Sequence, residues 1–112
     1  MSNWPLIVSA VLFGAWIVMT RMGKLAPAEA KRLVSEGAQL VDVRSPSEFS
    51  SGHIQDAKNI PVGDIDRRAK ELSKDKDVIV YCASGMRSAS ASRTLKSLGF
   101  KRVHDLGSMS RW

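Results

Sequence analysis

Residues 78–88 form the sequence VIVYCASGMRS, which predicts a buried strand, a tight turn and the start of a helix. The run Val78–Tyr81 is uninterruptedly apolar, as strands buried on both faces of a parallel sheet are. After the turn, apolar residues recur at helical spacing, so we expect a helix over 88–98. Cys82 therefore stands at the edge where open α/β sheets bind their ligands.

Cys82 is the only cysteine of the chain, and its surroundings are typical of a nucleophile. Backbone N–H groups of a turn at a helix start can surround an anion, and Arg87 favours thiolate over thiol. A lone cysteine often serves only as a small buried apolar residue, but that role requires neither Gly85 nor Arg87. We predict Cys82 as the catalytic residue. The predicted substrate-binding residues are Ala83, Ser84, Gly85, Met86, Arg87 and Ser88.

Helices and strands are expected to alternate along the remainder of the chain. From the hydrophobic pattern we predict a helix over 27–36, a strand over 39–43, a polar loop without regular structure over 45–52, a short strand over 57–60, a helix over 62–72 and a strand over 102–106. This alternation predicts an α/β fold with a mostly parallel central sheet and helices on both faces.

The first twenty residues differ from the rest. Residues 4–20 (WPLIVSAVLFGAWIVMT) carry no charged side chain, and Arg21 and Lys24 follow directly. As a helix they would reach about 26 Å, near the lower limit for crossing a bilayer core. We predict an N-terminal apolar helix that anchors the protein in the bilayer, with residues 1–24 as anchor and tether and the catalytic domain in the cytoplasm. The alternatives are a cleaved signal, which would place the domain in the periplasm, and a buried core helix.

The net charge of +6 belongs entirely to the chain after residue 20. A basic face beside a bilayer is attracted to anionic lipids. The sequence contains no basic stripe interleaved with aromatic residues, so we expect no binding to nucleic acid. One cysteine excludes an internal disulfide, and with His53 and His104 it supplies too few ligands for zinc, so we expect no metal and no cofactor.

Three charged residues are predicted to support the site. Asp42 ends a predicted strand, where it either accepts hydrogen bonds from the active loop or stabilises the fold as a buried carboxylate. Arg44 and Glu48 are predicted to form an ion pair that orders the polar loop. His53 is predicted to be a hydrogen-bonded structural residue.

From about Leu25 to Trp112 the chain resembles the single-domain rhodanese family. The motifs that carry the resemblance are Asp42-Val43-Arg44, Glu48-Phe49, Gly52-His53-Ile54, Ala57, Asn59-Ile60-Pro61, Cys82-x-x-Gly85-x-Arg87-Ser88, Gly99-Phe100, Val103, Leu106-Gly107 and Trp112. One position departs from the family pattern, because Ser108 stands where a second glycine is common. The resemblance implies a rhodanese-like domain over 25–112.

The resemblance also implies sulfurtransferase chemistry. Cys82 would take a sulfane sulfur from a small donor such as thiosulfate and pass the persulfide sulfur to cyanide or a thiol. Arg87 would hold the anionic end of the donor, and Ser88 would cap the following helix.

Other functions remain open. The protein could instead be a carrier that relays persulfide sulfur for a protein partner at the membrane. A phosphatase or arsenate reductase is less favoured. The resemblance implies that such relatives have one more residue between the cysteine and the arginine, whereas here four residues separate Cys82 from Arg87. A non-enzymatic scaffold is disfavoured, because Cys82, Gly85 and Arg87 are all present.

Overall fold

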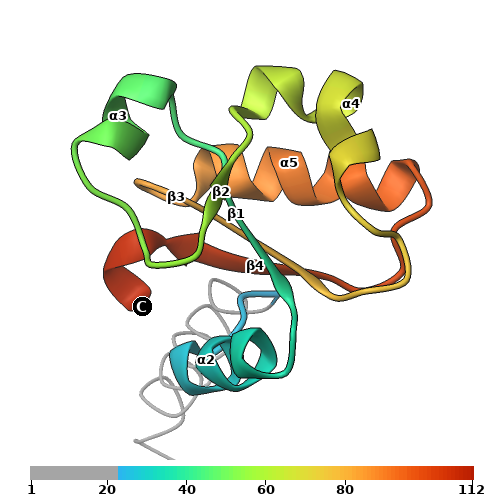
Figure 1. Ribbon diagram of the computed structural model, residues 1–112, viewed down its shortest axis with the longest axis horizontal. Coiled ribbons are helices and arrows are strands. Elements are labelled where there is room, and N and C mark those ends of the chain that lie inside the picture. Colours follow the sequence, from blue (N-terminus) through green and yellow to red (C-terminus); the bar gives the residue numbers. More distant parts are fainter. Residues whose placement is uncertain (1–22) are drawn as a thin grey trace, which may run out of the picture.

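A central sheet of four parallel strands organises the computed structural model, which describes residues 23–112. The strands are β1 (Gln39–Asp42), β2 (Lys58–Asn59), β3 (Val78–Cys82) and β4 (Val103–Ser108), in the order β2-β1-β3-β4 (Figure 1). The predicted parallel sheet is therefore confirmed. The apolar run before Cys82 forms an inner strand, with β1 on one side and β4 on the other.

Helices cover both faces of the sheet, as predicted (Figure 1). Helix α2 (Pro27–Ser35) lies on one face, and α4 (Ile65–Arg68) and α5 (Met86–Ser97) lie on the other. Successive side chains of β3 point to opposite faces. Val80 and Cys82 belong to the apolar cluster under α4 and α5, whereas Ile79 and Tyr81 belong to the cluster under α2.

The predicted polar loop over 45–52 is wrong, because it contains the short helix α3 (Pro46–Ser50). Ser45 and Glu48 form a capping box in which the Ser45 hydroxyl accepts from the Glu48 N–H and the Glu48 carboxylate accepts from the Ser45 N–H. Pro46 occupies the first helical turn, where its missing N–H costs little. Serine and proline thus begin a helix here.

The prediction of one continuous helix over 62–72 is also wrong, because the segment forms three short elements. The segment contains a 3₁₀ turn η1 (Val62–Asp64), then α4, then a second 3₁₀ turn η2 (Ala69–Glu71). Gly63 lies in the first turn and lowers its helical propensity. The predicted apolar face is nevertheless real, since Ile65, Ala69 and Leu72 are buried in the cluster under α4 and α5.

The other elements predicted within residues 23–112 are confirmed, with ends that differ by up to two residues. The helix predicted over 88–98 begins two residues earlier, and the last strand extends to Ser108, where the 3₁₀ turn η3 (Met109–Arg111) follows.

The described part of the predicted tether is packed onto the sheet. Lys24 forms a parallel β-bridge with Asp105 of β4, and the Leu25 N–H donates to the Asp105 carbonyl oxygen at 2.8 Å. Within residues 23–112, no helix is long and apolar enough to cross a membrane. The anchor predicted at residues 4–20 lies outside the described residues.

Candidate active site

The Cys82 loop, residues 82–88, joins the end of β3 to the first turn of α5. The Cys82 side chain is fully buried, and its sulfur accepts a hydrogen bond from the Gly85 N–H at 2.9 Å. Gly85 has a φ of 105°, in the left-handed region that glycine adopts without strain. A Cβ at this position would lie 3.7 Å from the nearest atom, so backbone conformation rather than lack of space favours glycine. The loop therefore curls over the sulfur, with a backbone N–H directed at it.

The pKa of the Cys82 thiol is shifted by opposing effects. Burial raises it, because desolvation disfavours the thiolate. Hydrogen bonds from the Ser88 hydroxyl and from the backbone N–H groups of Ser88, Gly85 and Ser84 lower it. The donors prevail, and the pKa of Cys82 lies below its ordinary value. The loop is thus suited to hold negative charge on sulfur.

Ser88 does not cap the helix, contrary to the prediction. Gly85 occupies the N-cap position, and Ser88 is the third residue of α5. Its buried hydroxyl donates to the Gly85 carbonyl oxygen at 3.1 Å and lies close enough to Cys82 to help lower the pKa of that thiol. Because α5 begins two residues earlier than predicted, this buried side chain belongs to the first turn of the helix.

Arg87 lies at the rim of the loop and is held by Glu48 of α3. Its two terminal nitrogens donate to the two carboxylate oxygens at 2.7 Å and 3.0 Å. The Arg87 guanidinium and the N–H of Ser45 hold the pKa of Glu48 at about 2. The pair is partly exposed, at 36% for each side chain, so it is accessible to a substrate anion. One carboxylate thus caps α3 and positions the arginine of the active loop.

The predicted ion pair between Arg44 and Glu48 is wrong, because Arg44 pairs with Asp42. Both side chains are buried, with an N–O distance of 2.7 Å, and the Arg44 N–H also donates to the carboxylate at 2.8 Å. Arg44 further donates to the Gly52 carbonyl oxygen at 2.6 Å, which ties β1 to the segment after α3. Of the two roles predicted for Asp42, the contacts match the buried carboxylate that stabilises the fold.

Sequence reasoning assigned no role to two polar side chains around the site. Asn59 donates to the backbone carbonyl oxygens of Asp42 and Arg44, both at 3.0 Å. Ser108, at the position where the family often has glycine, donates from its hydroxyl to the Ala83 carbonyl oxygen at 2.7 Å. Both residues lie at the carboxyl ends of strands, where open α/β sheets bind ligands, and this position in the sequence could have indicated that they lie near the site.

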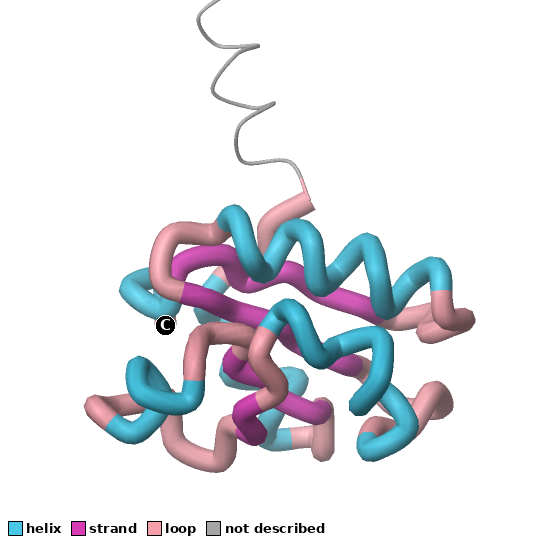
Figure 2. The backbone as a smooth tube through the Cα atoms, turned by 90° about the horizontal axis from the view of Figure 1, so that it is seen from above, coloured by secondary structure: helices cyan, strands magenta, loops and turns pink. Residues whose placement is uncertain are grey.

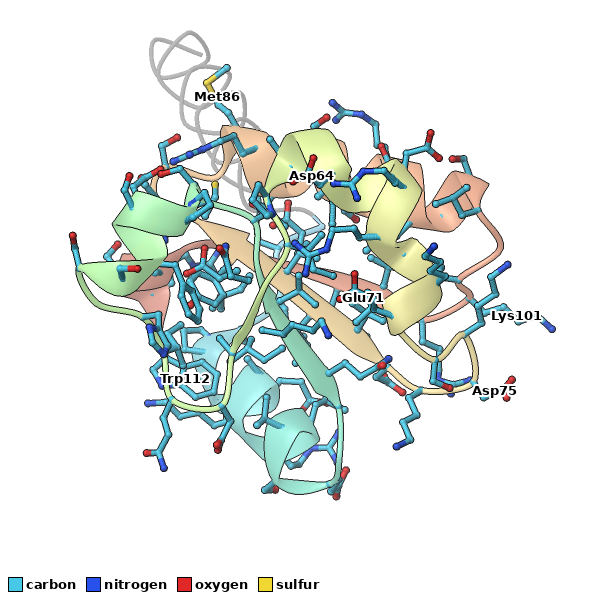
Figure 3. The ribbon with its side chains drawn as sticks, turned by 45° about the horizontal axis from the view of Figure 1, so that its top comes forward. Asp64, Glu71, Asp75, Met86, Lys101 and Trp112 are labelled. Carbon is cyan, nitrogen blue, oxygen red and sulfur yellow. The ribbon has the colours of Figure 1, made fainter. Side chains whose placement is uncertain are left out.

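The remaining predicted residues are Ala83, Ser84 and Met86 of the loop and His53, which follows α3. Ala83 and Ser84 are exposed on the loop, and Met86 projects into solvent with 81% of its surface exposed (Figure 3). His53 hydrogen-bonds to the Phe49 carbonyl oxygen through Nδ1 at 2.9 Å and stacks on the Phe49 ring. These contacts match its predicted structural role. Among residues 23–112, no group of three or more metal-ligating side chains comes together.

Comparison with known proteins identifies the family. The profile of the family described as "Rhodanese-like domain" matches residues 26–112. The chain belongs to the rhodanese-like family. This membership confirms the predicted rhodanese-like fold and supports sulfur transfer as the general chemistry of the site.

Individual rhodanese-like relatives are similar along most of the chain. The "Uncharacterized protein YqhL" of Bacillus subtilis (strain 168) is 34% identical over 100% of this chain and 94% of its own length. The "Thiosulfate sulfurtransferase GlpE" of Pseudomonas syringae pv. syringae (strain B728a) is 36% identical over 84% of this chain and 90% of its own. The crystal structure of a rhodanese-like domain protein from Staphylococcus aureus has a TM-score of 0.71 and 32% identity, over 81% of this chain and 91% of that one.

Proposed function

We propose that this protein is a thiosulfate sulfurtransferase-like enzyme that works through a persulfide on Cys82. The observation that carries the proposal is the buried Cys82 sulfur beneath the N–H groups and the Ser88 hydroxyl of the loop. The similarity to the relative named thiosulfate sulfurtransferase supports thiosulfate as the donor.

In the first half-reaction, the Cys82 thiolate attacks the outer sulfur of thiosulfate. A bond forms between the two sulfurs, the donor's own S–S bond breaks, and its electron pair leaves with sulfite. The product is a Cys82 persulfide with negative charge on the terminal sulfur. The loop N–H groups stabilise that charge as an oxyanion hole stabilises an oxygen.

In the second half-reaction, cyanide attacks the terminal sulfur and departs as thiocyanate, and the electrons of the persulfide bond return to Cys82 as thiolate. A thiol acceptor takes the sulfur in the same way. Arg87 holds the anionic end of the donor at the loop rim.

Intact-mass measurement after exposure to thiosulfate tests the proposal. The protein is expected to gain one sulfur atom and to lose it when cyanide is added, whereas Cys82→Ser gains none. Ser90→Ala is the matched control: it lies in α5 outside the Cys82 loop, keeps the thiol and is expected to gain the sulfur as the parent does. Thiocyanate formation by Cys82→Ser at the parent rate would refute the assignment of the nucleophile.

The size of the loop favours sulfur over a tetrahedral oxyanion. Four residues separate Cys82 from Arg87, and the Gly85 N–H already reaches the sulfur at 2.9 Å. Phosphatase or arsenate reductase activity is therefore the least supported alternative.

A persulfide carrier for a protein partner at the membrane is the second candidate. One observation favours it: Glu48 already binds both terminal nitrogens of Arg87 and offsets the charge that a small anionic donor would use. Comparing sulfur loading from thiosulfate with loading from a protein cysteine persulfide decides between the two. Faster loading from the protein donor at equal concentration would favour the carrier.

We further propose that residues 4–20 anchor the protein in the membrane, with the catalytic domain in the cytoplasm. The supporting feature is the uncharged run followed by Arg21 and Lys24. The protein is expected to sediment with membranes, to resist extraction by alkali and to be protected from protease outside spheroplasts. A mature N-terminus near Ala28 would instead indicate a cleaved signal and a periplasmic enzyme.

A further inference from the structure

The positive charge of the described residues is unevenly distributed along the chain. Residues 23–85 contain ten Lys or Arg and ten Asp or Glu, and are therefore neutral overall. Residues 86–112 contain six Lys or Arg and a single acidic residue, Asp105. The excess charge thus comes from α5, from the segment between α5 and β4, and from the C-terminal turn η3.

Four of these cations have no carboxylate partner within salt-bridge distance among residues 23–112. We call them the basic flank: Arg93, Lys96, Lys101 and Arg111. The other two of the six are engaged, Arg87 with Glu48 and Arg102 with Asp77. The flank therefore has free charge to offer a partner.

Helix geometry places two of these side chains on the β4 side of α5. Arg87 points toward α3, where it meets Glu48. Lys96 follows nine residues later, about half a turn from Arg87 around the helix, so it points away from α3. Arg93 lies three residues before Lys96 and shares its side of the helix. Figure 2 shows α5 over the β4 edge of the sheet, with α4 on its other side.

The other two members of the basic flank adjoin the ends of β4. Lys101 lies two residues before the strand, and Figure 3 shows its side chain projecting away from the domain. Arg111 lies in η3, directly after β4, and donates to the Leu25 carbonyl oxygen at 3.3 Å. All four cations therefore border the β4 edge of the sheet.

The chain enters the domain at this same edge. Lys24 pairs with Asp105 at 2.6 Å and bridges to β4. Residue 20 ends the uncharged run, and four residues span at most about 14 Å. Covalent geometry therefore keeps residue 20 within about 14 Å of Lys24, which lies at the β4 edge.

We propose that the basic flank lies on an anionic lipid surface. The inference rests on the proposed membrane anchor, whose end is held at the same edge of the sheet. Anionic headgroups attract basic residues held within a Debye length of the bilayer. The surface would fix the orientation of the domain and keep the Cys82 loop near the membrane, where a membrane-bound sulfur partner can reach it.

Lysine protection in vesicles tests the proposal on the full-length protein. The protein is reconstituted in phosphatidylcholine vesicles with or without phosphatidylserine and treated with a membrane-impermeant acetylating reagent. Acetylation of Lys96 and Lys101 is expected to slow about fivefold with phosphatidylserine and to recover at high salt. Lys58 in β2, at the opposite edge of the sheet, and Lys70 in η2 are internal controls whose rates should stay unchanged.

Two charge-reversal variants distinguish an effect of the basic flank from an effect of the protein's net charge. Arg93→Glu/Lys96→Glu should abolish the protection of Lys101, whereas Arg67→Glu/Lys70→Glu, with the same change in charge, should keep it. Both should retain sulfur transfer from thiosulfate, because none of these residues contacts the Cys82 loop. Equal protection at both edges of the sheet, or none at either, would overturn the proposal.

Vesicle flotation distinguishes failure of the anchor from failure of the basic flank. A chain that does not float with phosphatidylcholine vesicles refutes the anchor. Binding of that chain to phosphatidylserine vesicles would still support the basic flank, and binding to neither would overturn it. Stronger protection of Lys96 and Lys101 by duplex DNA than by phosphatidylserine at equal salt would assign the surface to nucleic acid instead.

Discussion

Replacing Asp42 with asparagine should destabilise the protein severely, because it leaves the Arg44 guanidinium buried without a counter-charge. Asp42 is fully buried and Arg44 is 7% exposed. Removing one partner of such a pair costs about 3–5 kcal/mol. A domain of this size loses about 4–8 °C of melting temperature per kcal/mol, so we expect a fall of about 12–40 °C. Total stabilities of about 5–15 kcal/mol leave little margin for this loss.

Urea unfolding and thermal melts, both followed by circular dichroism, measure the effect. Asp77→Asn is the matched control, since it removes the same charge from a carboxylate that is partly exposed beside Arg102. An exposed pair contributes about 1 kcal/mol or less. The double variant Asp42→Asn/Arg44→Met should regain at least half of the loss, because no unpaired buried charge remains. Equal losses for Asp42→Asn and Asp77→Asn would refute the reasoning.

Three further predictions concern the Cys82 loop. Ser88→Ala should raise the pH midpoint of Cys82 alkylation by iodoacetamide, since it removes a donor to the thiolate, whereas Ser90→Ala should leave that midpoint unchanged. Arg87→Ala should raise the KM for thiosulfate about tenfold, the effect of one hydrogen bond to a charged group, with little change in melting temperature. The pKa of Glu48 is about 2, so its side-chain carboxyl carbon should titrate near pH 2 by NMR and not at the ordinary 4.5. In Arg87→Ala that midpoint should rise toward 4.5, and an unchanged midpoint would contradict the assigned cause.

The elements that could be predicted from the sequence are those whose burial is uniform or periodic. Val78–Cys82 is buried at every residue, so an uninterrupted apolar run suffices to identify β3. α5 buries Ala91 and Leu95 at helical spacing, and Gly99 follows its end with a φ of 97°. The parallel direction of the strands required only that strands alternate with helices, because a parallel sheet follows from that alternation.

Helix α3 was not predicted, because the serine and proline content of the segment was interpreted without regard to where these residues stand. Ser45, Pro46 and Glu48 have the spacing of a capping box with proline in the first turn, a signal that was present in the sequence. The abundance of serine and proline in residues 45–52 instead indicated a loop. A five-residue helix buries no residue fully, so no hydrophobic periodicity corrected that interpretation.

The partners of the charged residues were not predictable from chain spacing. Arg44 and Glu48 are four residues apart, yet Arg44 turns back to Asp42 and leaves Glu48 free to reach Arg87, 39 residues along the chain. Since Arg44 also binds the Gly52 carbonyl oxygen, the buried pair fixes the segment that carries α3. Glu48 on that helix then fixes Arg87, the second residue of α5, whose first turn supplies Ser88 to the Cys82 sulfur. The buried pair thus supports the active loop without touching the nucleophile, and the connection exists only because the fold brings α3 beside the ends of β1 and β3.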